Sequence, residues 1–160
     1  MAEATPLPLK KNKNAKKDYL FAVGRRKAAV ARVRLFETVK ADLVWGELAI
    51  KKGELYVNQK PIAEYFSGEV SRRLYTEPLR ITNAHQMNYA FTIKVAGGGP
   101  SSQLQAAIAG ISNALSKLDP EKHRPTLKKK GFLTRDSRIR ERRTVGMGGK
   151  SRRKRQSPKR

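Results

Sequence analysis

Alternating apolar and polar positions along the chain predict its β-strands. The pattern is most regular at residues 87–95, where every second side chain is large and apolar: Met87, Tyr89, Phe91, Ile93 and Val95. Residues 30–36 also alternate, with apolar side chains on one face and arginines on the other. Two short apolar runs, at residues 19–23 and 55–57, complete a mainly four-stranded sheet. A turn at Gly24-Arg25-Arg26-Lys27 is predicted to interrupt the first of them.

An apolar stripe predicts a long helix after the three glycines at residues 97–99. Its members recur at three- and four-residue steps: Leu104, Ile108, Ile111, Leu115 and Leu118. We expect Ser101 or Ser102 to cap this helix, and a proline lies just past its end. Shorter helices are predicted at residues 61–74 and 120–130. These elements predict an α+β fold, a two-layer α/β arrangement with the helices packed on one face of the sheet.

The composition indicates a polyanionic partner. The 160 residues include 36 Lys and Arg against 13 Asp and Glu, a formal net charge of +23. A nucleic acid is therefore the first expected partner, and an anionic membrane surface is a distant second. The absence of cysteine excludes disulfides and thiolate metal sites. No apolar run reaches the roughly 18–20 residues of a membrane span, and residues 1–17 lack the apolar stretch of a signal peptide. We expect a soluble, cytoplasmic protein with no membrane partner.

The charge divides the chain into three parts. Residues 1–17 form a basic, flexible extension, and residues 18–127, with 16 basic and 10 acidic side chains, form a globular RNA-binding head. Residues 128–160 hold 15 basic and 2 acidic side chains and few large apolar ones. This segment cannot bury enough apolar surface to offset the entropy of ordering. We expect an extended basic tail that becomes ordered only on RNA.

Two groups of basic residues are candidate RNA-binding sites. The head group comprises Arg25, Arg26, Lys27, Arg32 and Arg34. It lies in a segment without acids until Glu37, and Gly24 would let the backbone approach phosphates closely. A solvated surface is the simple alternative, but the net charge favours contact with nucleic acid. The tail group comprises Lys128, Lys129, Lys130, Arg135, Arg138, Arg140, Arg142, Arg143, Lys150, Arg152, Arg153, Lys154 and Arg155. Such a spread suits a chain threaded between RNA helices.

Motifs for catalysis or cofactor binding fail on their details. Residues 148–151 end like a phosphate-binding loop, but Thr144 stands where that loop needs its first glycine. The glycines at 97–99 lack the lysine of such a loop and the spacing of a dinucleotide fingerprint, so we interpret them as a tight connection. The two histidines, His85 and His123, lack metal-ligand spacing. We expect no enzyme activity, no cofactor and no metal site.

Several motifs follow one another along the chain. They are Gly24-Arg-Arg-Lys-Ala-Ala-Val-Ala-Arg-Val-Arg34, Val57-Asn-Gln-Lys-Pro61 with Tyr65-Phe66, Val95-Ala-Gly-Gly-Gly99, Gly131-Phe-Leu-Thr-Arg-Asp136 with Arg138 and Glu141-Arg142-Arg143, and the basic end Lys159-Arg160. In this order they resemble one family closely, the ninth protein of the small ribosomal subunit, bacterial type. The resemblance covers about residues 19–160 and identifies the chain as a structural constituent of the ribosome that acts in translation.

The resemblance implies a small α/β head bound to ribosomal RNA, beside neighbouring proteins, in the head of the small subunit. It also implies a tail that threads ribosomal RNA toward the peptidyl site, where Lys159 and Arg160 would approach the anticodon stem-loop of tRNA. The chain departs from the family at Pro158, near the tip. Gln59 stands where the family commonly has glycine, which argues against a left-handed turn there. The connection at residues 38–52 is longer than usual and is either an enlarged hairpin or a lineage-specific contact.

Two other classes of protein stay open on the residues alone. A nucleoid-type DNA-binding protein would use the same attraction to phosphates. An RNA-modifying or nucleotide-using enzyme has only the glycine-rich loop in its favour. Sedimentation with small ribosomal subunits after a high-salt wash separates both from a structural ribosomal protein.

Overall fold

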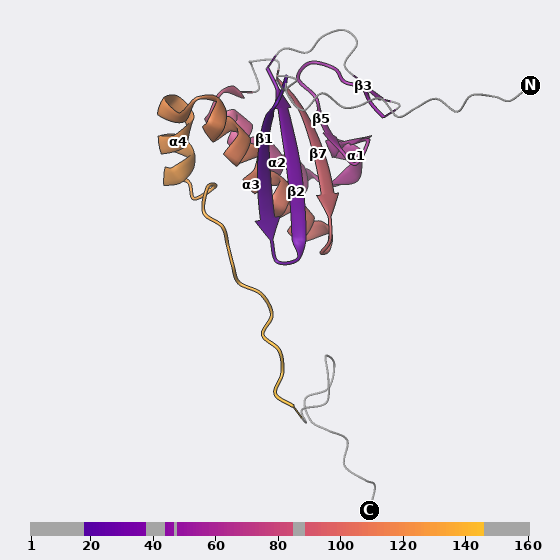
Figure 1. Ribbon diagram of the computed structural model, residues 1–160, viewed down its shortest axis with the longest axis vertical. Helices are drawn as coiled ribbons and strands as arrows, with labels where there is room; N and C mark the ends of the chain where they lie inside the picture. Colours follow the sequence, from indigo (N-terminus) through magenta and orange to yellow (C-terminus); the bar gives the residue numbers. More distant parts are fainter. Residues whose placement is uncertain (1–17, 38–43, 47, 85–88, 146–160) are drawn as a thin grey trace, which may run out of the picture.

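The computed structural model describes residues 18–37, 44–46, 48–84 and 89–145. Its central sheet has five strands in the order β1-β2-β7-β5-β6 (Figure 1). The strands are β1 (Leu20–Arg26), β2 (Ala29–Phe36), β5 (Leu55–Val57), β6 (Lys60–Pro61) and β7 (Ala90–Ala96). Neighbouring strands are antiparallel except β5 and β7, which are parallel. The four expected strands are present, and the short β6 adds a fifth at one edge.

Strands β1 and β2 form a long hairpin with a two-residue turn at Lys27 and Ala28. Lys27 has a φ of 51°, the left-handed conformation that such tight turns use. The prediction that Gly24 interrupts the first strand is wrong, because Gly24 lies inside β1. A Cβ atom on Gly24 would lie 2.0 Å from the carbonyl oxygen of Ala106 in helix α3 (Pro100–Leu118). Glycine therefore serves the close passage of a helix, not of a phosphate.

Three further helices accompany α3: α1 (Ile62–Tyr65), α2 (Glu69–Ile81) and α4 (Pro120–Lys129). The single helix predicted at residues 61–74 is wrong. It is divided into α1 and α2 by a break that includes Gly68, whose φ is 102°, and α2 continues through Pro78. None of the helices in the described ranges is long and apolar enough to cross a membrane.

Helix α3 begins differently from the prediction. Gly99 is its N-cap residue, no side-chain hydrogen bond caps it, and Pro100 takes the first helical position. Proline is well suited to that position because its missing N–H would have no partner there anyway. Caps at Ser101 or Ser102 are therefore a wrong prediction, although the helix itself is confirmed.

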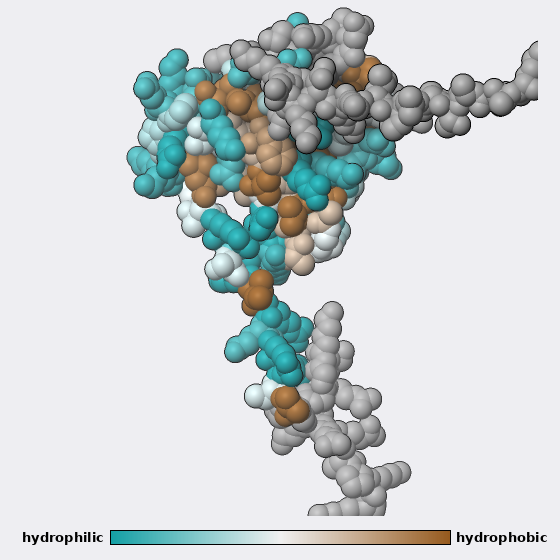
Figure 2. Space-filling view, viewed as in Figure 1, coloured by the Kyte–Doolittle hydropathy of each residue, from teal (hydrophilic) through white to brown (hydrophobic). Residues whose placement is uncertain are grey.

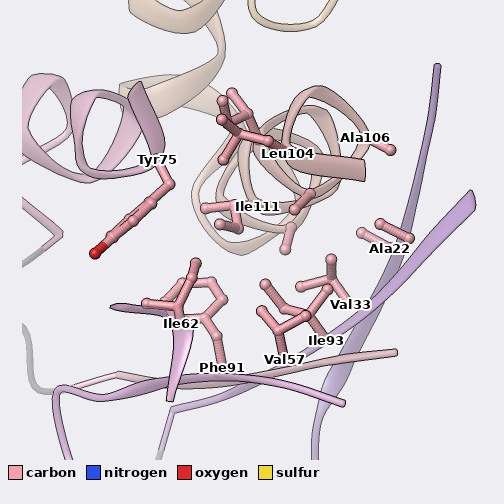
Figure 3. Close-up of a cluster of buried hydrophobic side chains, with 14 of the residues drawn as sticks. Ala22, Val33, Val57, Ile62, Tyr75, Phe91, Ile93, Leu104, Ala106 and Ile111 are labelled. Carbon is pink, nitrogen blue, oxygen red and sulfur yellow. The ribbon is translucent and has the colours of Figure 1, made fainter. Parts of the chain in front are cut away.

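The main core lies between the helices and one face of the sheet (Figure 3). It contains most of the predicted stripe of α3 together with apolar side chains from the strands and α2: Ala22, Val33, Val57, Tyr75, Phe91, Ile93, Leu104, Ile108, Ile111 and Leu115. Leu118, the last member of the stripe, is only partly buried. The α+β, two-layer prediction is confirmed.

A second, smaller apolar cluster covers one end of the opposite face. Its buried members are Phe36, Ile50, Tyr56 and Ala90. Trp45 and Leu48 pack against it from a hairpin of β3 (Val44–Trp45) and β4 (Leu48–Ala49). The described part of the long connection at residues 38–52 is therefore a hairpin that packs on the sheet.

The turn between β5 and β6 is left-handed at both central residues. Asn58 has a φ of 47° and Gln59 a φ of 65°, so the expectation against a left-handed turn is wrong. The Asn58 side chain explains why the turn holds. Its Nδ2 donates to the Val95 carbonyl at 3.1 Å, and its Oδ1 accepts from the Val95 N–H at 2.9 Å. The turn is thus tied to β7 by an amide that spans both backbone groups of one residue.

Helix α4 ends in a Schellman motif at the root of the tail. The N–H of Phe132 donates to the carbonyl of Leu127 at 3.1 Å, and Gly131, with a φ of 78°, donates to Lys128 at 3.0 Å. Phe132 and Leu133 pack against the main core. The expected start of the tail, residue 128, thus falls in the last turn of α4. Residues 135–144 have no helix or strand and run away from the head (Figure 1).

Candidate nucleic-acid interface

Four exposed basic side chains lie on the face of the sheet that is turned away from α3, which we call the open face. They are Arg25 of β1, Arg32 and Arg34 of β2, and Lys94 of β7. Directly opposed residues in neighbouring strands share a face, and Arg32 lies opposite Lys94. None of the residues of β1, β2 and β7 is acidic. These strands lie in front of α3 in Figure 1, so that view is taken from the open face.

Acidic side chains in the described ranges do not neutralise the cations of the open face. Among the described residues, Arg25, Arg32 and Lys94 form no ion pair. The guanidinium of Arg34 lies 5.0 Å from the ring centroid of Tyr19, a cation–π contact that leaves its charge in place. The result is a concentrated positive surface over three strands.

Apolar side chains lie between these cations. Phe21 and Val23 of β1 and Val30 of β2 share the open face, because they lie opposite Arg34, Arg32 and Arg25 respectively. Phe21 is 43% exposed, which is unusual for a phenylalanine. Figure 2 shows the resulting mixture of hydrophobic and hydrophilic surface over the strands. The open face can therefore contact both charged and apolar groups.

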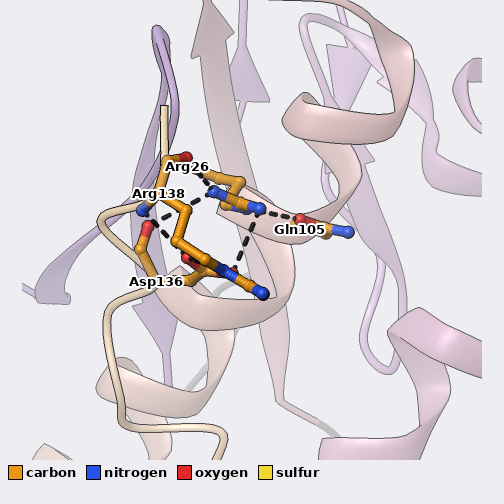
Figure 4. Close-up of polar contacts among 4 residues, drawn as sticks. All are labelled: Arg26, Gln105, Asp136 and Arg138. Carbon is orange, nitrogen blue, oxygen red and sulfur yellow. Dashed lines mark hydrogen bonds and ion pairs between the residues drawn. The ribbon is translucent and has the colours of Figure 1, made fainter. Parts of the chain in front are cut away.

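Arg26 lies on the other face of β1, and the structure does not bring it together with its predicted companions. Its Nε donates to Gln105 of α3 at 2.8 Å, and its Nη1 donates to the carbonyl of Arg138 at 2.7 Å (Figure 4). Its Nη2 lies 3.1 Å from Oδ2 of Asp136, and the side chain is only 13% exposed. Arg26 thus joins the root of the tail to α3.

Asp136 is held between two arginines at this junction. Hydrogen bonds from the side chain and backbone N–H of Arg138, with a smaller contribution from the charge of Arg26, hold the pKa of Asp136 well below its usual range. The same contact raises the pKa of Arg138. One of the tail's acids is therefore used within the protein, and it fixes where the tail leaves the head.

The remaining predicted residues fall into four groups. Lys27 is exposed at the tip of the β1–β2 hairpin, and Lys128, Lys129 and Lys130 are exposed at the end of α4. A third group is exposed along the irregular segment after α4: Arg135, Arg138, Arg140, Arg142 and Arg143. The rest lie outside the described residues: Lys150, Arg152, Arg153, Lys154, Arg155, Lys159 and Arg160.

Sequence reasoning missed three members of the open face, Lys94, Phe21 and Tyr19. The alternation at residues 87–95 already assigns Lys94 to the polar side of its strand. Its position beside Arg32 requires the pairing of β2 with β7, which join segments far apart in the sequence. The sequence alone did not give the order of the strands in the sheet, which is needed to place Lys94 beside Arg32.

Two of the places where a catalytic or nucleotide site was considered have structural roles among the described residues, and residues 148–151 lie outside those residues. Gly97 and Gly98 have φ values of 74° and 67°, and a Cβ on Gly97 would lie 2.5 Å from the carbonyl oxygen of Ala28. The glycines therefore form a tight connection against the β1–β2 turn. His123 is buried in α4, with its Nε2 3.6 Å from Oδ2 of Asp119, and His85 lies outside the described residues. The described residues contain no group of three or more potential metal-ligating His, Cys, Asp or Glu side chains.

A family model described as ribosomal protein S9/S16 matches residues 24–160. The chain belongs to this family. It is also 40% identical, over 126 residues, to the small ribosomal subunit protein uS9 of Leifsonia xyli subsp. xyli (strain CTCB07). The aligned region covers 79% of this chain and 67% of that relative. The family model's match begins at Gly24, inside β1, and includes β2 and the entire tail.

Family membership confirms the resemblance seen in the motifs. This ribosomal protein is a structural component of the small subunit, a cytoplasmic particle, and takes part in translation without being an enzyme.

Proposed function

We propose that the chain binds small-subunit ribosomal RNA through the open face of its sheet and through its basic tail. The observation that carries the proposal is the concentration of Arg25, Arg32, Arg34 and Lys94 on one exposed face without an acidic residue in the three strands. Such cations neutralise phosphates and release condensed counterions. An RNA double helix and a folded RNA loop both offer phosphates to such a surface.

The tail extends the same interaction beyond the head. Its described part carries five exposed arginines, at positions 135, 138, 140, 142 and 143. The apolar side chains of Ile139 and Val145 are exposed there and do not form a core. The sequence of the tail is too poor in apolar residues to fold alone, so it gains order by lying along RNA.

The tip of the tail is proposed to lie beside peptidyl-site tRNA through Lys159 and Arg160. Every tRNA must be accepted at this site, so contact with phosphates suits the task better than reading of bases. Contacts between cations and phosphates in solvent are worth roughly 1 kcal/mol or less each. This part of the proposal rests on the family motif at the end of the chain.

Replacement of Arg32 and Arg34 by Gln tests the head interface. We expect the doubly substituted chain to lose in competition with the unchanged chain for incorporation into small subunits, and the slope of log K against log salt to fall by about one to two. Replacement of Arg72 and Arg80 by Gln on α2 removes the same charge from another surface and is the matched control. Equal incorporation of all three folded chains, checked by circular dichroism, would contradict the proposal.

The same reconstituted subunits test the tip. Deletion of Lys159 and Arg160 should leave assembly intact and weaken tRNA binding at the peptidyl site by about tenfold at most, the factor that corresponds to 1.4 kcal/mol. Unchanged affinity at two salt concentrations would remove the tip from the proposal while leaving the open face in it.

A further inference from the structure

The open face contains a hollow of about 440 Å³ at the hairpin end of β1 and β2. Six of its lining side chains carry the argument: Phe21, Val23, Arg25, Val30, Arg32 and Ala96. Three of them are short and apolar, one is aromatic, and two are arginines. The volume is within the range of about 300–1,000 Å³ at which proteins bind small organic groups.

The fold holds Phe21 in place although its ring is exposed. Its carbonyl oxygen accepts a hydrogen bond from Nζ of Lys117 at 2.8 Å, and the carbonyl of Val23 accepts one from Nδ2 of Asn113 at 3.1 Å. Both donors belong to α3, which thereby fixes the outer edge of β1. The wall of the hollow is formed before any ligand arrives, so binding requires little ordering of the protein.

We propose that this hollow binds one unpaired nucleotide of ribosomal RNA. The planar face of the base would stack on Phe21 and the apolar side chains beside it, and Arg25 and Arg32 would contact the phosphates on either side. Unpaired bases expose their faces and are commonly bound by aromatic rings and guanidinium planes. The proposal rests on RNA binding by the open face and adds the class of RNA element that binds there.

The mixture of groups in the hollow decides against two other occupants. A regular RNA helix keeps its base faces stacked and presents phosphates and riboses. It would engage the arginines and leave Phe21 in contact with water. A protein segment would need acidic groups for both arginines and an apolar group between them. The two arginines, which form no ion pair among the described residues, match the charge of a nucleic acid backbone directly.

A crosslinking experiment identifies the occupant in assembled small subunits. The chain has no cysteine, so Ala28→Cys at the edge of the hollow provides a single attachment point for a short photoreactive group. Val70→Cys on α2, 73% exposed, is the control on another surface. We expect the probe on Ala28→Cys to crosslink to an unpaired nucleotide of the ribosomal RNA. Crosslinks only to paired nucleotides, or to another protein, would overturn the proposal.

Chemical modification of the crosslinked base then tests stacking. In subunits that contain Phe21→Ala, its reactivity should rise by about fivefold to a hundredfold, since base–aromatic stacking is worth about 1–3 kcal/mol. Phe21→Trp should keep the base protected, and Leu74→Ala, which truncates another exposed apolar side chain, should change nothing. If Phe21→Ala does not assemble, Phe21→Leu preserves an apolar side chain without the ring and should show the same rise.

The outcomes separate this inference from RNA binding itself. Unchanged base reactivity in Phe21→Ala or Phe21→Leu, together with RNA crosslinks from Ala28→Cys, would leave the open face bound to RNA and refute the nucleotide site. The absence of RNA crosslinks from Ala28→Cys, together with normal incorporation of the Arg32 and Arg34 variant, would refute both.

Discussion

Gly24 has a role that depends on a single missing methyl group. A Cβ atom there would lie 2.0 Å from the carbonyl oxygen of Ala106 and 2.4 Å from the nitrogen of Gly110. Both are backbone atoms of α3, which cannot move aside as a flexible side chain would. We expect Gly24→Ala to lower the free energy of unfolding by at least about 3 kcal/mol, the upper end of the usual cost of overpacking. Urea denaturation measures this loss.

Gly99→Ala is the control for that substitution. Its φ is −110°, and a Cβ atom there meets nothing within 4 Å. The expected loss is below about 1 kcal/mol, since Gly99 contributes only as a helix cap. A loss in Gly24→Ala no larger than in Gly99→Ala would contradict the close passage of α3 at Gly24.

Asp136 gives the root of the tail a predictable response to pH. Its pKa is lower in the folded protein than in the unfolded chain, so its contribution is present above the usual value of 3.8 and is lost only as the pH falls through the lower folded value. We expect the carboxylate to stay ionised when the pH reaches 3.8. A carboxyl NMR titration measures its midpoint, and Arg138→Gln should move that midpoint upward because Arg138 supplies the main cause. An ordinary midpoint in the unchanged protein would contradict the contact.

Two neighbouring residues of β1, Arg25 and Arg26, lie on opposite faces of the sheet. Arg26 holds the tail root through the carbonyl of Arg138 and the carboxylate of Asp136, whereas Arg25 lies on the open face. We expect Arg26→Gln to speed tryptic cleavage after Arg135 and Arg138 several-fold with little effect on RNA binding by the head. Arg25→Gln removes the same charge and should weaken RNA binding by the head while leaving the rate of tryptic cleavage unchanged. The same cleavage rates in both variants would show that Arg26 does not anchor the tail.

The strands and helices could be predicted largely from periodicity because each depends on a few neighbouring residues. The strands at residues 30–36 and 55–57 and the apolar stripe of α3 were visible without the structure. The division of the predicted helix at 61–74 was missed because it depends on Gly68 and on which residues of α2 reach the core, namely Tyr75 and Leu79. Those contacts exist only after the chain has folded.

The candidate site was predicted in part for the same reason. Alternation correctly assigned Arg32 and Arg34 to the polar face of their strand. It could not assign Arg26 to the opposite face, because the segment after Gly24 was interpreted as a turn. Lys94 could not be placed beside Arg32 without knowing that β2 pairs with β7.

The Schellman motif after α4 bears on where the independently folding head ends. We propose that the head extends to Leu133, because Phe132 and Leu133 pack against the main core and Leu127 is fully buried beneath them. A chain that ends after Thr134 keeps this packing and loses only the contacts of Asp136 and Arg138 with Arg26, so it should be nearly as stable as the full chain. A chain that ends after Leu127 should lose roughly 2–3 kcal/mol of stability, the contribution of about two half-buried apolar side chains and a helix cap. Urea denaturation of the two truncated chains measures the difference, and equal stabilities would place the boundary after Leu127.

The molecule has two basic surfaces of different order, the open face of the sheet and the irregular segment after α4. The open face belongs to a packed sheet, whereas the segment from residue 135 to 144 has no regular structure and is mostly exposed. In the RNA complex that we propose, binding by the head would order few groups, and binding by the tail would order many.

The pairing of β2 with β7 also sets an order of events during synthesis. The β1–β2 hairpin closes through a two-residue turn, but the inner edge of β2 pairs with a strand that is synthesised about sixty residues later, which is roughly 3–12 s at 5–20 residues per second. Until then β2 presents an unpaired edge, and contacts between such distant segments form slowly. Its outward-facing Arg32 and Arg34 oppose pairing with other nascent chains, because like charges repel. The arginines that we propose to face RNA in the finished protein would thus also protect the same strand while the protein is still being made.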